Sequence, residues 1–517
     1  MIEEAHKASF FVSNLFQFGL IYTFYTTLSQ FCFLIWLNLC IFISFKPLLF
    51  MVGREKEVQL LDNKYKSNKS EFVAVFGRRR VGKTYLVRSV FQDKMTFQFT
   101  GLANATITKQ LINFELTLNE QFPRLNSTKI VNWLDAFQQI KILISQSSQS
   151  KKVIFIDELP WLDTRNSDFI QALEHFWNSW ASNRTDILLI VCGSSASWMI
   201  NKLINNKGGL HNRITAKLKI EPFKLSECKE FVKHKNILLS NYHLIELYMV
   251  FGGIPYYWES IEKGKSVFQL VQQTCFDDNG ILKTEFLTVF KSLFTHGEKH
   301  ELIIEAIAKK NKGLSREEIL KTTQLSNGGS LTRMLRELEE SGFIRSYTPI
   351  GKKSKNTLYQ LVDFYSSFYL KFIKPNEKQE VNWLSKIDTP EYLNWVGYAF
   401  EQVCFYHIQE IKKELGISGI DSQQFSWKST LSENGAQIDM IIDRSDKTIN
   451  VCEMKFAAAE FSIDKKYDLN LRNKIAVFKE ETKTKKSVHL TMITPYGLKQ
   501  NEYTAMVQNS ITIDAFF

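Results

Sequence analysis

Paired cysteines are absent from this chain of 517 residues. No two of its seven cysteines form a Cys-x-x-Cys pair, so the sequence suggests neither a zinc site nor a disulfide framework. Isolated cysteines fit a reducing compartment, and we expect the protein to be cytoplasmic. Internal repeats and long low-complexity linkers are also absent, so domain boundaries have to be inferred from changes in secondary-structure pattern.

Charge is missing from the whole stretch between Lys7 and Lys46. Its core, Phe31–Phe45 (FCFLIWLNLCIFISF), is long and apolar enough to resemble a membrane span. The preceding MIEEAHK is not a positive n-region and no small-residue cleavage site follows, which argues against a signal peptide. Two interpretations of residues 1–50 stay open. They are an over-extended start, with the domain beginning at Met51 (MVGREKEVQLL), or they are a membrane anchor.

The overall composition is that of a globular protein, with 44% hydrophobic and 23% charged residues. A chain of this length is too long for a single core, so we expect two to four domains. The formal net charge of +11 favours a polyanionic partner, with nucleic acid first and a membrane surface second.

Buried strands alternate with helical patterns from Met51 to about Ile220. The apolar runs FVAVFG (Phe72–Gly77), KVIFIDE (Lys152–Glu158) and DILLIVCGSS (Asp186–Ser195) read as strands of a parallel sheet covered on both faces. The pattern then becomes mostly helical to about Phe290. Residues 300–361 read as three helices and a hairpin, and the last 150 or so residues mix strands and helices.

A phosphate-loop pattern follows the first strand, in GRRRVGKT. Gly77 and Gly82 let the backbone wrap round phosphates so that its N–H groups point inward. Lys83 is expected to reach the β- and γ-phosphates of ATP, and the Thr84 hydroxyl to bind Mg²⁺.

Acidic and polar residues follow the next two predicted strands. Asp157 is expected to hold Mg²⁺ and Glu158 to activate the attacking water. Ser194 or Ser195 is expected to face the γ-phosphate, although a small-residue turn explains them too. Arg213 is a candidate for stabilising transition-state charge or, equally, a solvated surface arginine.

These stretches resemble, in order, the AAA+-like ATPases of the archaeal ATPase family within the STAND group. The resemblance rests on MVGREKE, FGRRRVGKT, IFIDELPWL, CGSSASWM and FGGIPYYW, and it covers about Met51 to Phe290. It implies a P-loop ATPase core at 51–220 and a helical lid at 221–298, with GGIP near the nucleotide. Arg78, Arg79, Arg80, Val81 and Tyr85 then belong to the nucleotide-binding loop, and the arginines form a basic rim with no identified partner.

The stretch Gly313–Asp363 reads as a winged helix, which we place at 299–363. Ser315 and Glu318 form a capping box, and Leu331, Met334, Leu335 and Leu338 line one face of the next helix, which Gly342 ends. If that helix enters a major groove, Thr332, Arg333 and Arg336 face DNA, and Lys352, Lys353 and Lys355 in the hairpin loop meet phosphates. The alternative is a structural or protein-binding module.

Four charged residues in the last part of the chain have suggestive spacing. Glu401 lies in a predicted helix, Asp439 in a strand, and Glu453 and Lys455 on one face of the next strand. Antiparallel pairing could bring Asp439 alongside. Its carboxylate and that of Glu453 suit Mg²⁺ or Mn²⁺, which would activate water while Lys455 positions the nucleophile.

This pattern resembles the core of PD-(D/E)xK nucleases, and its order is similar to the DUF234 domain that accompanies this ATPase family. The resemblance covers about Tyr359 to the end and places a C-terminal α/β restriction-endonuclease-like domain at 364–517. The expected proline before the first acid is replaced by Ile438. Two other interpretations remain, namely surface charges on a hairpin, or a nuclease fold that only binds DNA or protein.

The sequence therefore predicts an ATP-hydrolysing, DNA-associated protein in which nucleotide state controls a metal-dependent nuclease-like domain. A switch that assembles with a partner protein or with itself according to its nucleotide is the rival. A membrane-tethered ATPase is the third option, and it depends on residues 1–50 alone.

Overall fold

The computed structural model describes residues 51–123, 129–294, 296–348, 357–377, 379, 381–387, 389–429 and 436–517. Val52–Phe517 form one compact unit. The predictions for residues 1–50 and for the hairpin-loop lysines Lys352, Lys353 and Lys355 lie outside the described residues. Among the described residues, no helix is both long enough and apolar enough to cross a bilayer.

A five-stranded parallel sheet occupies the first part of this unit. Its strands are β1 (Glu71–Gly77), β2 (Met95–Thr100), β3 (Lys152–Asp157), β4 (Ile187–Gly193) and β5 (Ala216–Ile220), in the order β2-β3-β4-β1-β5. Every neighbouring pair is parallel. β1 and β4 are buried along their whole length, as continuous apolar strands between two helical layers must be. The predicted α/β class with a parallel sheet is confirmed.

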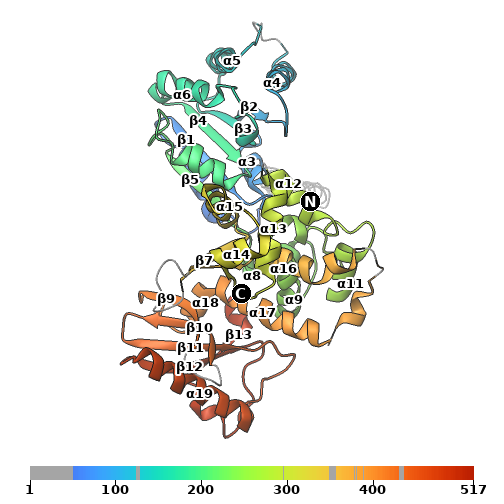
Figure 1. Ribbon diagram of the computed structural model, residues 1–517. Helices are drawn as coiled ribbons and strands as arrows, with labels where there is room; N and C mark the ends of the chain where they lie inside the picture. Colours follow the sequence, from blue (N-terminus) through green and yellow to red (C-terminus); the bar gives the residue numbers. More distant parts are fainter. Residues whose placement is uncertain are drawn as a thin grey trace, which may run out of the picture. The chain divides into compact units, whose positions relative to one another are not determined.

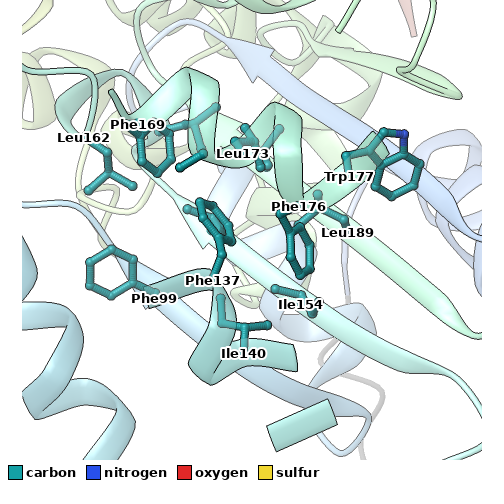
Figure 2. Close-up of a cluster of buried hydrophobic side chains, with 14 of the residues drawn as sticks. Phe99, Phe137, Ile140, Ile154, Leu162, Phe169, Leu173, Phe176, Trp177 and Leu189 are labelled. Atoms are coloured by element: carbon teal, nitrogen blue, oxygen red, sulfur yellow. The ribbon is translucent and has the colours of Figure 1, made fainter. Parts of the chain in front are cut away.

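Helices surround this sheet and supply the rest of its core. They are α2 (Glu55–Tyr65), α3 (Lys83–Phe91), α4 (Ile107–Gln121), α5 (Trp133–Gln146) and α6 (Phe169–Ser179). Figure 2 shows where α5 and α6 meet the sheet, with the rings of Phe137 and Phe176 stacked at 5.0 Å between centroids. Each such buried side chain stabilises the fold by about 1.5–3 kcal/mol. This packing makes the sheet a rigid support for the loops at its carboxyl edge.

The segment after β5 is helical, as predicted. Its main helices are α8 (Leu225–His234), α9 (Asn241–Phe251), α10 (Pro255–Trp258), α11 (Val267–Val271) and α12 (Glu285–Leu293). The chain turns sharply between α9 and α10, where Gly252 has a φ of 59°. A Cβ on the next residue, Gly253, would lie 1.8 Å from the Phe223 carbonyl oxygen, so only glycine allows this close approach.

Three helices and a small antiparallel sheet follow, in the predicted order. They are α13 (Gly297–Ala308), β6 (Leu314–Ser315), α14 (Arg316–Thr323), α15 (Gly329–Glu340), β7 (Ile344–Tyr347) and β8 (Leu358–Leu361), with strand order β6-β8-β7. The predicted capping box is present, since the Glu318 carboxylate accepts from Ser315 N–H at 2.7 Å. The predicted inward face of α15 is buried and Gly342 follows its end with a φ of 76°.

The last part of the chain contains a five-stranded mixed sheet. Its elements are α16 (Phe364–Phe368), α17 (Pro390–Tyr406), α18 (Ile408–Glu414), β9 (Ser422–Lys428), β10 (Gln437–Arg444), β11 (Thr448–Met454), α19 (Lys465–Thr482), β12 (Ser487–Thr494) and β13 (Asn509–Thr512). The strand order is β13-β12-β11-β10-β9. Figure 1 shows α19 along this sheet, and Leu471 and Phe478 of that helix share a buried core with Ile441 and Met492 of the strands.

Candidate functional site

The loop after β1 has the backbone geometry of a phosphate cradle. Gly77 has a φ of 144°, and a Cβ there would meet the Ile220 carbonyl oxygen at 2.3 Å. Gly82 precedes α3 with a φ of 89°, a conformation that L side chains rarely adopt. Lys83 begins α3, is buried, and donates to the Arg78 carbonyl oxygen at 2.8 Å. The lysine therefore lies across its own loop, with its charge held by a backbone oxygen.

The strand order explains how the acidic and polar residues meet this loop. Because β4 lies between β1 and β3, Ser194 at its carboxyl end lies between the loop and the Asp157–Glu158 pair. The Thr84 hydroxyl donates to Asp157 Oδ2 at 2.8 Å. Glu158 accepts from the Ser194 hydroxyl at 2.6 Å and from the Ser194 backbone N–H at 3.2 Å. The Glu158 backbone N–H donates to Asp157 Oδ1 at 3.0 Å and so connects these two pairs at the carboxyl edge of the sheet, where ligands of open α/β sheets bind.

The donor set at this edge fits a nucleotide and a hard cation. Thr84 and Asp157 offer a hydroxyl and a buried carboxylate oxygen, the ligand types that Mg²⁺ takes alongside phosphate oxygens. Glu158 adopts a left-handed backbone conformation with a φ of 49°. Non-glycine residues in that region cost about 1–3 kcal/mol and cluster at functional positions.

The loop arginines do not form a free basic rim, because two of them are paired inside the chain. Arg78 forms a buried ion pair with Asp363, and its guanidinium lies 4.6 Å from the centre of the Phe343 ring. Arg80 pairs with Glu285 at 2.7 Å and lies 4.2 Å from the Tyr256 ring. The partners of these loop arginines are thus two acids far away in sequence, Glu285 at the start of α12 and Asp363 just before α16.

The remaining predicted residues of this region are placed as follows. Tyr85 is 50% exposed on α3. Val81 is buried, and its carbonyl oxygen accepts from the guanidinium of Arg54, a residue of the initial MVGREKE stretch, at 3.3 Å. Arg79 and Ser195 are partly exposed. Arg213 is exposed in the turn before β5.

A family model of an ATPase domain, predominantly from Archaea, matches residues 51–261. The matched segment is similar to ATPase domains of that family. The match starts at Met51 and ends just after the GGIP turn, so it takes in the parallel sheet and the first helices after it. The predicted resemblance of this region to archaeal ATPases is confirmed.

The chain is similar to several archaeal proteins. The uncharacterized protein MJECL04 of Methanocaldococcus jannaschii is 29% identical over 366 residues, which is 70% of this chain and 78% of that protein. The Walker-type ATPase PABY2304 of Pyrococcus abyssi has a TM-score of 0.47 at 16% identity, covering 62% of this chain and 96% of that one. The ORC2 protein of Aeropyrum pernix has a TM-score of 0.39 at 14% identity, covering 66% and 96%.

A second group of charged residues lies on the C-terminal sheet. β10 and β11 pair antiparallel with Met440 opposite Cys452, and one further step of that register sets Asp439 opposite Glu453. The pairing of β10 with β9 shifts between Ile438 and Ile441, an irregularity that flanks Asp439. Such bulges re-aim side chains and are frequent beside active sites. The predicted antiparallel approach of Asp439 and Glu453 is confirmed.

The three acids of this group influence one another. Burial and, to a smaller extent, the nearby charge of Asp439 together raise the pKa of Glu401 to about 8, while Lys455 opposes the shift. Burial and the same aspartate also raise the pKa of Glu453. Glu401, Asp439, Glu453 and Lys455 are therefore close in space, as their motif spacing predicted.

Three further residues belong to this group and carry no sequence signal that would have identified them. Glu453 is fully buried and accepts from Lys474 at 2.7 Å and from the Tyr467 hydroxyl at 3.2 Å. Burial lowers the pKa of Lys312, which lies near enough to Asp439 and Glu401 for their charges to oppose that shift. Among the residues that the structure describes, no three His, Cys, Asp or Glu side chains are arranged to hold a metal ion.

A buried histidine joins the ATPase domain to α17. His407 Nε2 accepts from the backbone N–H of Leu225, the first residue of α8, at 3.1 Å, and its Nδ1 donates to the Val403 carbonyl oxygen at 2.9 Å. Burial lowers the pKa of His407 to about 4. Lys224 and Glu410, paired at 2.5 Å, and the hydroxyls of Tyr248 and Tyr406 are the titratable groups around it. The ring must stay neutral to keep its bond to Leu225.

We expect the free energy of unfolding to fall as the pH drops from about 6.5 to about 4. Over this window the unfolded chain binds a proton at His407 and the folded chain does not, so stability present at neutral pH is lost, by about 3 kcal/mol. Urea unfolding at several pH values measures this slope. His407→Gln should flatten it, whereas the exposed His211→Gln should not. An unchanged slope in His407→Gln would assign the titration to another group.

Proposed function

We propose that this protein hydrolyses ATP and that its nucleotide state controls a DNA-associated, nuclease-like C-terminal domain. In this proposal residues 51–220 are the AAA+-like core, 221–298 the lid, 299–363 a winged helix and 364–517 the nuclease-like domain. Two things support the proposal. One is the connected polar group at the edge of the parallel sheet, and the other is the clustering of Glu401 of α17 with Asp439, Glu453 and Lys455 at the C-terminal sheet.

In the ATPase domain the roles follow from the contacts. The backbone of Gly77–Gly82 binds phosphates, and Lys83 moves from the Arg78 carbonyl oxygen to the β- and γ-phosphates. Mg²⁺, held by Thr84 and Asp157, would neutralise phosphate charge. Glu158 orients and deprotonates the attacking water, and Ser194 holds that carboxylate in position. We assign to Arg213 the role of donating hydrogen bonds to the phosphate oxygens as negative charge develops on them in the transition state. Its side chain is exposed, so it would act on the nucleotide of its own chain or on that of a neighbouring copy.

Association with DNA is supported by charge and by the exposed face of α15. Thr332, Arg333 and Arg336 are all exposed on that helix, and the formal net charge of the chain is +11. Side chains of this kind on the second helix of a helix-turn-helix read bases and bind phosphates. The hairpin-loop lysines would add phosphate contacts.

The C-terminal acids support the nuclease-like assignment. Opposed carboxylates on neighbouring strands with a lysine two residues further on form the arrangement in which a metal-activated water is positioned for phosphodiester attack. In this proposal Asp439 and Glu453 bind Mg²⁺ or Mn²⁺. Glu453 must first give up its ion pair with Lys474 for the metal ion.

A nucleotide-dependent switch that docks a protein partner, or another copy of itself, is the second candidate. Two observations favour it. The carboxylate of Glu453 is already satisfied by Lys474 and Tyr467, and α15 contacts α7 (Ala196–Trp198), the turn that follows Ser194. A helix that rests on the ATPase domain can report its nucleotide state without touching DNA.

Cleavage of DNA by the full chain distinguishes the two candidates. We expect supercoiled and linear DNA to be cut with Mg²⁺ or Mn²⁺, at a rate that ATP changes. Asp439→Ala and Lys455→Ala should remove cleavage and spare ATP hydrolysis, while Asp446→Ala, on an exposed turn after β10, should leave both unchanged. Cleavage that persists in both active-group variants would refute the nuclease assignment. Intact ATP turnover without any cleavage would favour the switch.

A further inference from the structure

A cavity of about 200 Å³ touches the phosphate loop only through Arg78, and none of Lys83, Thr84, Asp157 and Glu158 lines it. It is bounded by the Gly252–Ile254 turn, by β7, by the start of α16 and by α17, and we call it the junction cavity. Its walls are largely aromatic and glycine, with Tyr248, Phe364, Phe405 and Tyr406 among the lining side chains. A Cβ added to Gly342 would meet no atom within 4 Å, so there is open space beside this residue.

Two polar side chains line the junction cavity without a complete set of partners. Arg345 donates through Nε to Gln360 at 2.8 Å, and its guanidinium lies 4.2 Å from the centre of the Phe405 ring. No acid of the described residues forms an ion pair with it. Gln402 is only 6% exposed, and its amide makes no hydrogen bond within the described chain. Buried amides are normally paired, and the partly exposed guanidinium of Arg345 has no acid partner, so both groups are suited to a ligand.

The charges of the cavity define the ligand further. Arg78 also lines it, but its charge is neutralised by Asp363, so Arg345 is the one uncompensated cation of the lining residues. A single guanidinium binds a carboxylate through two parallel N–H···O bonds, whereas a phosphate dianion would retain unbalanced charge.

The volume limits the rest of the molecule. An apolar cavity of about 150 Å³ takes one benzene ring, and pockets for larger metabolites measure about 300–1,000 Å³. The junction cavity therefore has room for one ring and one carboxylate but not for a nucleotide. Its aromatic walls suit a planar ring.

We propose that the junction cavity binds a small aromatic or heteroaromatic carboxylate, with the carboxylate on Arg345, a polar ring substituent on Gln402 and the ring among Phe364, Phe405 and Tyr406. The ligand would lie against Arg78 and Asp363, the ion pair that fixes the phosphate loop. Its binding would thus alter the loop. This site does not depend on the proposed nuclease or ATP chemistry.

Salicylate is the probe that tests the site, titrated into the full chain by calorimetry with MgADP in excess so that the phosphate loop is blocked. We expect binding at millimolar concentrations or tighter, with salicylamide and acetate at least tenfold weaker because each lacks either the charge or the ring. Arg345→Met should weaken salicylate binding at least tenfold. Arg165→Met, which removes an exposed arginine away from the cavity, should not change it.

A second variant protects the test against a misfolded Arg345→Met. Gln402→Leu keeps the volume of the side chain, should fold, and should weaken salicylate binding at least threefold while leaving benzoate, which has no polar ring substituent, unchanged. Absence of salicylate binding at 10 mM, or equal binding in the wild type and both cavity variants, would overturn the proposal. If the wild type failed to bind ADP, the proposed ATP site would be refuted, but the salicylate titration would still test the junction cavity.

Discussion

Replacing Glu158 with glutamine is expected to leave ATP binding unchanged within about threefold and to lower the turnover number by about 10²–10³. Glutamine fills the same space and can keep one hydrogen bond to Ser194, whose hydroxyl lies 2.6 Å from Glu158 Oε1. It cannot accept a proton from the attacking water. The loss is therefore expected in the chemical step alone, measured as the release of phosphate at saturating ATP beside a nucleotide-binding titration.

Two comparison variants make this result specific. Lys83→Ala should lose nucleotide binding itself, because it removes the cation that contacts the phosphates. Glu230→Gln, on the exposed side of α8, should change neither binding nor turnover. If Glu158→Gln hydrolyses ATP at the wild-type rate, another group activates the water. If it fails to bind, the carboxylate acts in holding the loop rather than in the reaction.

The proposed ATP site could be predicted from the sequence because its chemistry is local. Gly77, Gly82 and Lys83 are fixed by a loop of eight residues, and Asp157 and Glu158 end a continuous buried strand. Strands β2 and β5 were not anticipated, since β2 contains polar residues and β5 alternates exposed lysines with buried Leu218 and Ile220 at the sheet edge. Local hydrophobicity does not distinguish such strands from loops.

The C-terminal group was predictable for a similar reason and only in part. A short connection between β10 and β11 sets their register, which brings Asp439 opposite Glu453. Lys474 comes from α19 and Lys312 from the segment before β6. No periodicity links those positions to the strands, because their approach is decided by how whole helices pack.

The feature that the sequence predicts least is which acids form ion pairs with the arginines of the phosphate loop. Arg78 and Asp363 are 285 positions apart, and nothing near either residue indicates the other. Their pairing ties the phosphate loop to the start of α16, while Arg80 and Glu285 tie it to α12. Each guanidinium already gives part of its N–H donors and its charge to a buried acid. These ion pairs therefore connect the shape of the loop to segments outside the sheet.

Removing the charge of Asp363 should destabilise the protein strongly. Asp363→Asn keeps the N-cap of α16, where the side chain accepts from Ser366 N–H at 3.0 Å, but leaves the buried guanidinium of Arg78 without a counter-charge. Breaking a buried ion pair from one side costs about 3–5 kcal/mol, so denaturant unfolding should show a loss of that size. Asp446→Asn, on the exposed side of its turn, should cost less than about 0.5 kcal/mol.

The double variant decides whether the cost comes from the stranded charge. If it does, adding Arg78→Met to Asp363→Asn should restore about half or more of the lost stability, because no unpaired cation remains buried. Additive losses would instead show that each side chain acts through its own neighbours, Phe343 for the arginine and Ser366 for the aspartate. Restored stability together with altered ADP release would mean that the pair itself carries the state of the phosphate loop to α16, and hence to everything that follows it in the chain.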